Sequence, residues 1–266
     1  MTKPVLSVVE AKLEVDGRVL WEGLNLEVQP NEFIAVLGAN GSGKTSLLKA
    51  ILGQMPLSAG EIRLIGKKVS RGSRKIGYVP QHRQPETTMP LRAKDLLWLG
   101  LNGDRFGFWF PKPGAKKQFE HILDAIDGRR LQNRPISELS GGELQRFRVG
   151  QAVIDEPDLI LADEPLSALD YSQQAAVAEL LSRESREHGA AVLFVTHDVN
   201  PVLSMVDRVL YLAGGSFRIG TPDEVLTSET LSELYGTAID VVRNQGRIVV
   251  LGAHDDHAHH HDEEWA

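Results

Sequence analysis

The sequence predicts an α/β fold: a largely parallel β-sheet covered by helices, with an antiparallel β subdomain at the N-terminus and an inserted helical subdomain. Three observations lead to this prediction. The first strand patterns follow one another around a turn, as in an antiparallel sheet. Short apolar runs then alternate with helical patterns, which is typical of a parallel sheet covered on both faces. Between about residues 82 and 155 the strand signals fade and helical patterns dominate.

The N-terminal third is expected to hold five strands and one helix. Asp16-Gly17 is a turn signal between the first two strands, and Gly53 is placed to end the helix. The expected elements are strands Leu6–Val15, Val19–Val28 and Phe33–Leu37, helix Ser46–Leu52, and strands Glu61–Ile65 and Ile76–Val79.

The remaining two thirds begin with helices and end with strands alternating with helices. An aromatic loop broken by Pro and Gly, residues 105–114, separates the first two helices. The expected elements are helices Ala93–Leu99, Lys116–Ile126 and Glu143–Ile154, strand Leu159–Ala162, helix Ser172–His188, strand Ala191–Val195, hairpin Arg208–Ala213 with Ser216–Ile219, two short helices, and hairpin Ile239–Arg243 with Arg247–Leu251.

These patterns divide the 266 residues into four parts. The core comprises residues 1–81 and 156–240, and the inserted helical subdomain comprises residues 82–155. A C-terminal hairpin (241–253) and a polar tail (254–266) follow. The tail is too polar to bury a core and is expected to be disordered.

Composition narrows the function classes. The chain is 42% hydrophobic and 24% charged, which is ordinary for a soluble globular protein. Its formal charge is −7, so it lacks the basic surplus of a nucleic-acid binder, and no nucleic-acid partner is expected. The absence of cysteine excludes disulfides, thiolate metal sites and a cysteine nucleophile. No run approaches the ~18 apolar residues of a membrane span, and the first residues do not resemble a signal peptide.

The C-terminal tail carries a distinct pattern. Its last 13 residues hold five acids and five of the nine histidines. Neutral imidazoles and carboxylates suit Zn²⁺, so His257, His259, His260 and His261 are candidate ligands. A solubilising acidic tail or the remnant of an expression tag would explain the same composition.

A glycine-rich segment predicts a phosphate site. Gly38-Ala-Asn-Gly-Ser-Gly-Lys44-Thr45 matches the P-loop pattern G-x-x-x-x-G-K-[ST] between an expected strand and helix. Its glycines let backbone N–H groups converge on phosphate oxygens, and the helix N-terminus adds partial positive charge. Lys44 would reach the β- and γ-phosphates, and the Thr45 hydroxyl would hold Mg²⁺. The predicted phosphate-binding residues are Gly38, Ala39, Asn40, Gly41, Ser42, Gly43, Lys44, Thr45 and Ser46.

Two acids end the strand at residues 159–162. Asp163 fits the role of Mg²⁺ anchor, and Glu164 is then placed to polarise an attacking water as general base. A surface turn with two solvated acids would be the plain alternative for Asp-Glu-Pro in isolation. The P-loop makes the catalytic interpretation the better one.

The segment Leu139-Ser-Gly-Gly-Glu-Leu-Gln-Arg146 resembles the signature sequence of ATP-binding cassette (ABC) ATPases. The other motifs of that family follow in order. Gln81, in Tyr78-Val-Pro-Gln, resembles the Q-loop glutamine, Ser167–Asp170 resembles the D-loop, and His197 resembles the switch histidine. The resemblance covers about residues 5 to 240 and implies a P-loop NTPase (RecA-like) core.

The resemblance also implies a composite site made by two chains. In the family, two cassettes pair head to tail, so that Ser140, Gly141, Gly142, Glu143 and Asp170 of one chain would close over the nucleotide held by Lys44 of the other. Gln81 and His197 would lie near the γ-phosphate, with Gln81 also close to Mg²⁺. A serine and two glycines at a helix start can indeed form an anion site, although a simple helix cap would explain Ser-Gly-Gly alone.

This sequence departs from the family pattern in two places. Family members often carry an aromatic residue that stacks on adenine at the position of Val15, and Trp21 is expected in the next strand instead. The predicted adenine contact is therefore either weaker than in the family or purely aliphatic. Glu143 occupies a signature position where glutamine is commoner.

One cassette without a long heptad run resembles a transporter subunit more than a DNA-repair or translation ABC protein. The resemblance then implies ATP and Mg²⁺ as ligands, and a second copy of the chain, integral membrane permease subunits and, indirectly, a solute-binding protein as partners. It implies a peripheral location on the cytoplasmic face of the membrane, with residues 82–84 at the edge of a permease groove.

Residues 99–113 resemble the corresponding region in importers of zinc, manganese and iron, although generic filling of the helical subdomain would also account for them. The expected activity is ATP hydrolysis coupled to transport, with divalent metal uptake as the leading substrate class. An iron-chelate importer, an exporter, a regulatory ABC ATPase without a permease and a small-molecule kinase are the alternatives.

Overall fold

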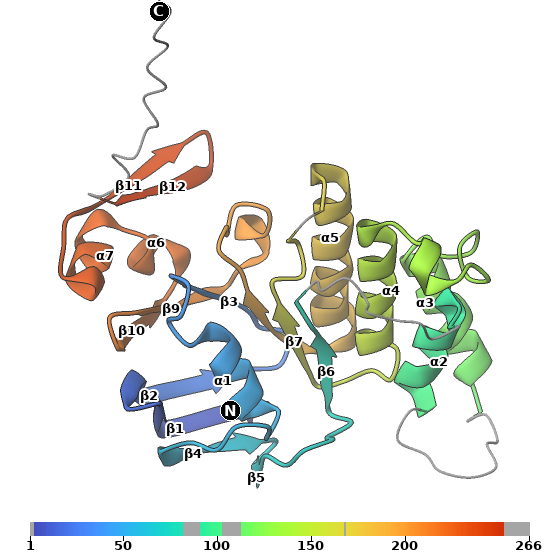
Figure 1. Cartoon of the computed structure of the whole chain (residues 1–266), viewed down its shortest axis with the longest axis horizontal. Helices are drawn as coiled ribbons and strands as arrows, with labels where there is room; N and C mark the ends of the chain where they lie inside the picture. Colours follow the sequence, from blue (N-terminus) through green and yellow to red (C-terminus); the bar gives the residue numbers. More distant parts are fainter. Residues whose placement is uncertain (1–2, 82–90, 103–112, 168, 253–266) are drawn as a thin grey trace, which may run out of the picture.

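The computed structural model describes residues 3–81, 91–102, 113–167 and 169–252. Its centre is a six-stranded sheet with the order β10-β9-β3-β8-β7-β6, parallel except for β10 (Figure 1). The strands are β3 (Phe33–Gly38), β6 (Ile76–Val79), β7 (Leu159–Asp163), β8 (Ala191–Val195), β9 (Arg208–Ala213) and β10 (Ser216–Gly220). Every residue of β7 and β8 is buried, which explains why both read as continuous apolar runs.

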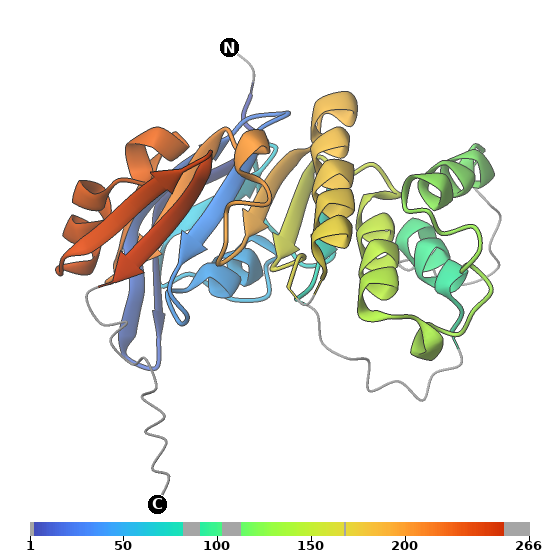
Figure 2. The ribbon, with the colours of Figure 1, turned by 90° about the horizontal axis from the view of Figure 1, so that it is seen from above.

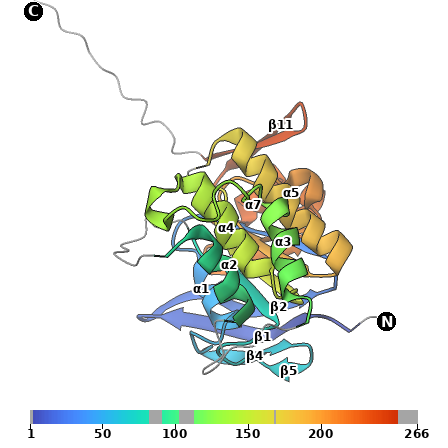
Figure 3. The ribbon, with the colours of Figure 1, turned by 90° about the vertical axis from the view of Figure 1, so that its right-hand side faces the viewer.

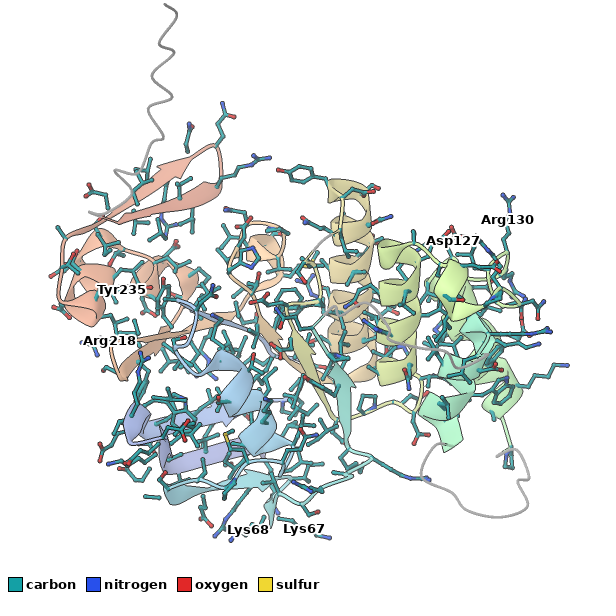
Figure 4. All side chains as sticks on the ribbon, in the orientation of Figure 1. Lys67, Lys68, Asp127, Arg130, Arg218 and Tyr235 are labelled. Carbon is teal, nitrogen blue, oxygen red and sulfur yellow. The ribbon has the colours of Figure 1, made fainter. Side chains whose placement is uncertain are left out.

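A second, antiparallel sheet packs near the first, with the order β2-β1-β4-β5. Its strands are β1 (Leu6–Val15), β2 (Arg18–Val28), β4 (Ala59–Leu64) and β5 (Lys67–Lys68), whose two lysines project outward (Figure 4). Asp16 and Gly17 both have positive φ, as a tight hairpin turn requires. Helix α1 (Lys44–Ile51) buries Leu47, Leu48 and Ile51 in an apolar core shared by the two sheets.

Three helices lie side by side at one end of the molecule (Figures 1 and 3). They are α2 (Ala93–Asn102), α3 (Ala115–Ala125) and α4 (Gly141–Val153), with a 3-10 turn at Ile136–Glu138 before α4. Trp98 and Phe119 stack with their ring centroids 4.7 Å apart. Helix α5 (Tyr171–His188) lies between this group and the sheet (Figure 2), and one continuous apolar core joins all four helices to the sheet.

The C-terminal elements pack at the opposite end. They are a 3-10 turn at Leu203–Met205, helices α6 (Pro222–Val225) and α7 (Ser228–Tyr235), and the hairpin of β11 (Ile239–Asn244) and β12 (Arg247–Gly252). Tyr235 of α7 meets Tyr211 of β9 with their hydroxyl oxygens 3.2 Å apart, and Arg218 of β10 lies 3.2 Å from Glu233 (Figure 4 labels Tyr235 and Arg218).

The structure confirms the predicted α/β class and its antiparallel N-terminal subdomain. Most expected elements occur within a few residues of their predicted limits. The helix after the P-loop begins at Lys44 rather than Ser46, because Gly43 in the left-handed region directly precedes its first turn. Three predicted segments lie outside the described residues: the aromatic segment 105–110, residues 82–84 and the histidines of the tail.

In the described ranges, no helix combines the length and apolar character needed to cross a membrane.

Candidate nucleotide site

The P-loop connects β3 to α1, and the glycines at its two ends pack closely against neighbouring strands. Gly38 has φ +140°, and a Cβ there would lie 2.1 Å from the carbonyl oxygen of Leu212 on β9. Gly43 has φ +96°, and its Cβ would lie 2.9 Å from Nε1 of the fully buried Trp21. Only glycine fits these two positions, since a side chain would displace the loop or the neighbouring sheet.

Lys44 folds back across this loop. Its Nζ donates hydrogen bonds to the carbonyl oxygens of Gly38 (2.6 Å) and Ala39 (3.1 Å). Burial lowers the pKa of the ammonium, while the charges of Glu164 and Asp163 act to raise it. The loop therefore holds a cation beside the acidic pair.

The start of α1 offers donors to an anion. Its cap residue is Gly43, which provides no side-chain hydrogen bond, whereas Ser140 and Asp170 cap α4 and α5. The N–H groups of a first helical turn have no acceptors within the helix. The buried Ser42 Oγ also lacks a hydrogen-bond partner. This set fits phosphate oxygens, and the predicted residues Gly38–Ser46 are placed to form it.

A hydroxyl and a carboxylate meet beside the P-loop. Thr45 Oγ1 donates to Asp163 Oδ1 at 3.1 Å, and the Tyr78 hydroxyl lies 3.5 Å from Asp163 Oδ2. Burial raises the pKa of Asp163, an effect that the hydrogen bond from Thr45 opposes. Both groups are hard oxygen donors of the kind that Mg²⁺ prefers. Because the described residues contain no cluster of three His, Cys, Asp or Glu suited to a metal, an ion here would also need phosphate oxygens.

Two of the predicted catalytic residues, Gln81 and His197, lie beside the carboxylate of the third, Glu164. Gln81 Nε2 donates to Glu164 Oε2 at 2.9 Å, and His197 Nδ1 lies 4.0 Å from the same oxygen. Glu164 has φ +47°, and its N–H donates to the carbonyl of Val195 at the end of β8. A non-glycine residue in this backbone region is uncommon and is often found at functional sites. The Glu164 side chain is thus held beside Gln81 and His197, and its backbone is fixed to the end of β8.

The signature segment lies apart, at the start of α4. Ser140 and Glu143 form a reciprocal capping box: the Ser140 N–H donates to Glu143 Oε2 (2.8 Å), and the Glu143 N–H donates to Ser140 Oγ (3.3 Å). A Cβ on Gly142 would lie 2.1 Å from Gln173 Oε1 of α5. Asp170 caps α5 by accepting from the Gln173 N–H at 2.8 Å. Among the described hydrogen bonds and ion pairs, none joins this segment to Lys44 or Glu164.

The side chains that support the P-loop were only partly visible in the sequence. Val15 ends β1 and is half-buried, so its predicted adenine contact stays a prediction. Trp21 has no exposed surface and packs against Gly43 instead of offering a stacking face. The sequence analysis missed the supporting roles of Trp21, Tyr78 and Gln173. Of these, only Tyr78 carried a signal, because it lies on the strand that leads to Gln81.

Known proteins resemble this chain over most of its length. The ABC transporter family profile matches residues 21–167. The zinc import ATP-binding protein ZnuC 1 of Hahella chejuensis is 32% identical, over 88% of this chain and 84% of that protein. The zinc transport system ATP-binding protein TroB of Treponema pallidum is 33% identical, over 83% of this chain and 82% of that protein.

A solved structure shares both the fold and part of the sequence. It is described as an inward-facing conformation of a metal-chelate type ABC transporter, with a TM-score of 0.78 and 28% identity over 93% of this chain and 96% of that chain. This chain therefore belongs to the ABC transporter family and is an ATP-binding subunit that hydrolyses ATP to power transport.

Proposed function

We propose that this chain powers the uptake of a divalent metal ion, zinc or manganese. The observation that carries the proposal is the similarity to subunits named for zinc import, which are 32% and 33% identical over 88% and 83% of this chain. Substrate choice belongs to the partner subunits, so the proposal concerns the transporter that this subunit serves.

The residues of the site receive distinct roles in this proposal. Lys44 binds the β- and γ-phosphates, Thr45 and Asp163 hold Mg²⁺, and Gln81 contributes to the shell of the ion. Glu164 takes a proton from the attacking water, and His197 stabilises the γ-phosphate. Mg²⁺, when bound, neutralises charge on the phosphates. The hydrogen bonds of Thr45 to Asp163 and of Gln81 to Glu164 support these assignments.

A second copy of the chain completes the site. ABC ATPase subunits generally dimerise and pair with membrane permeases. Here Ser140, Gly141 and Gly142 would close over the nucleotide of the partner copy, with Glu143 fixing the cap and Asp170 holding the adjacent helix start. What supports this is that, among the described hydrogen bonds and ion pairs, none joins the signature segment to Lys44 or Glu164 of the same chain.

A hollow beside Gln81 suits a permease helix. It has a volume of about 430 Å³ and lies between β6 and helices α2 and α4, with Tyr78, Pro80, Leu99 and Gln151 among its lining residues. Leu99 is 45% exposed there, an apolar side chain that a partner would cover. Docking at this hollow would place the subunit at the cytoplasmic face of the membrane, and the solute-binding protein would act through the permease.

Metal uptake by cells tests the substrate. Cells lacking this chain are complemented with the wild-type gene or with Glu164→Gln, and uptake of radioactive zinc and manganese is followed. Restoration of zinc or manganese uptake by the wild type alone is expected. Restoration of iron-chelate uptake instead, or of neither metal, would contradict the proposed substrate.

Co-purification tests the transporter assignment separately. The wild-type chain, extracted in mild detergent, should bring down an integral membrane protein, and substitution of Leu99 by Glu should weaken that association. Recovery without any membrane subunit would favour the regulatory ATPase instead.

We also propose that the tail binds Zn²⁺ through His257, His259, His260 and His261. Because the composition of the tail is too polar for a folded core, the affinity should be modest, and it should fall at acidic pH as the imidazoles become protonated. Zn²⁺ titration of the full chain against a chain ending at Gly252 is the direct test. Equal binding by both chains would contradict this proposal.

A further inference from the structure

The side-chain amide of Asn200 joins two distant parts of the chain. Its Nδ2 donates to the carbonyl oxygen of Ile248 at 2.9 Å, and its Oδ1 accepts from the Ile248 N–H at 2.7 Å. Asn200 follows β8 in the loop that carries His197, and Ile248 belongs to the C-terminal hairpin, which lies beside this loop (Figure 2). The amide thus pairs with the hairpin backbone as a neighbouring strand would.

The hairpin itself is fixed by contacts that do not involve the loop. Ser232 Oγ accepts from the Ile239 N–H at 2.9 Å, and Ser228 Oγ accepts from the Val241 N–H at 2.8 Å. Arg243 pairs with Asp223 at 2.5 Å. The side chains of Ile239 and Ile248 are buried in the main core. The hairpin therefore gives the loop a fixed attachment point rather than moving with it.

A chain of short contacts leads from Asn200 to His197. The backbone N–H and Nδ2 of Asn200 both donate to Asp198 Oδ1, at 2.9 and 2.8 Å. Thr196 Oγ1 accepts from the Asp198 N–H (3.1 Å) and donates to the Asp198 carbonyl (2.7 Å). The Thr196 N–H donates to Val36 of the central strand β3. His197 lies in sequence between Thr196 and Asp198, which are hydrogen-bonded to each other. The position of the His197 backbone is therefore set by these two neighbours.

The position of that backbone matters because little else restrains the histidine. The His197 side chain is 66% exposed, and its Nδ1 lies 4.0 Å from Glu164. On its outer side the loop borders a hollow of about 250 Å³, lined by Tyr171, Asp198, Asn200 and Arg247 among others. The loop therefore has room to shift if the amide contact is lost.

We propose that Asn200 is a positioning residue for hydrolysis: by tying the loop to the C-terminal hairpin, it sets the place of His197 beside Glu164. The proposal rests on the role of His197 proposed above. It makes the hairpin part of the apparatus that hydrolyses ATP, although none of the described hydrogen bonds or ion pairs joins a hairpin residue to the predicted nucleotide site.

Asn200→Ala in the full chain is the first test. Because small displacements near a reacting centre are costly, kcat at saturating MgATP should fall about tenfold, while MgATP affinity should change less than about twofold. Asn200→Asp keeps the acceptor for the Ile248 N–H, but it loses the donor and places a second carboxylate beside Asp198. Its kcat should fall by a similar factor, and it serves as the second variant if Asn200→Ala folds poorly. Asn244→Ala, exposed near the hairpin turn, is the matched control and should behave as wild type.

A double-mutant cycle separates positioning from general stabilisation. If Asn200 acts through His197, Asn200→Ala in a His197→Ala background should lower kcat less than about twofold further. An equal factor in both backgrounds, or a wild-type kcat for Asn200→Ala, would overturn the proposal. Native hydrolysis by His197→Ala alone would instead contradict the role assigned to the histidine, which keeps the two failures distinguishable.

Discussion

The predicted nucleotide site has two halves, the P-loop half and the signature half, and they differ in how their residues are brought together. The P-loop half brings Lys44 and Thr45, at the start of α1, beside Asp163 and Glu164, at the end of β7. Thr45 is hydrogen-bonded to Asp163 and Gln81 to Glu164, while Lys44 donates to the carbonyl of Gly38 in the loop. The signature half is one helix start, at which Ser140 and Glu143 satisfy each other. The residues proposed to hydrolyse ATP are thus assembled within one chain, while the signature segment makes none of the described hydrogen bonds or ion pairs with Lys44 or Glu164.

The difference extends to local stability. The P-loop half contains a buried lysine, a buried carboxylate, an unpartnered serine hydroxyl and a helix without a side-chain cap. The signature half has a full capping box, although the side chain of its fully buried Gln145 also has no hydrogen-bond partner among the described residues. Violations of local stability rules tend to gather where a ligand will satisfy them. The two halves therefore differ at the helix start itself, which has no side-chain cap in the P-loop half and a full cap in the signature half.

Removing the proposed general base should have the largest effect on the P-loop half. Glu164→Gln should lower the hydrolysis rate by at least about 10²-fold, because proton transfer is lost while the phosphate site stays intact. MgATP should still bind and should hold two chains together, which size-exclusion chromatography with MgATP can show. Glu229→Gln on α7, an exposed position, is the control. Native hydrolysis by Glu164→Gln would exclude this residue as the base.

Mixed dimers test whether the two halves meet between chains. Lys44→Ala and Ser140→Arg should each be inactive alone. In an equal mixture, half of the dimers should pair the two variants and hold one intact composite site each, so about a quarter of the wild-type activity is expected if sites act independently. Phosphate release after mixing measures it. No recovery at any ratio, with both variants folded, would contradict head-to-tail pairing.

Packing behind the signature gives a smaller, structural effect. Gly142→Ala should lower the free energy of unfolding by about 1 kcal/mol, since the new Cβ collides with the Gln173 side chain. Urea unfolding measures the loss, and Gln173→Ala should restore stability in the double variant. If Gly142→Ala slows hydrolysis with unchanged stability, the glycine serves the partner's nucleotide rather than the packing of α4 on α5.

The smallest effect concerns the buried carboxylate of the P-loop half. Burial raises the pKa of Asp163, so its stability contribution is present below the unfolded-state value of about 4 and is lost as the pH rises through the folded-state value. Asp163→Asn should therefore unfold at a higher temperature than wild type at pH 7, without nucleotide, and this advantage should shrink as the pH falls toward about 4.

The exposed Asp127, labelled in Figure 4, provides the matched control. Asp127→Asn should show no comparable gain in melting temperature at pH 7. A lower melting temperature for Asp163→Asn at that pH would show that the hydrogen bond from Thr45 outweighs the burial of the charge.

Local pattern predicted most of this architecture, because periodic apolar runs and motif residues are properties of neighbouring positions. The meeting of Gln81 with Glu164 depends on β6 pairing with β7, and it was expected only through the family resemblance. The packing of Trp21 on Gly43 and of Gln173 on Gly142 could not be predicted, since each joins elements whose relative placement is tertiary. The limits of the four parts, the Val15 contact and the tail ligands stay predictions.

Trp21 gives the protein an optical property as well as a packed core. Its indole borders the glycine that begins the P-loop helix, while no part of the ring reaches solvent. The emission of a buried indole responds to small changes in the dipoles and charges around it. Trp21 is one of four tryptophans, so with Trp98, Trp109 and Trp265 replaced by phenylalanine it would serve as a fluorescent reporter of nucleotide binding beside the loop.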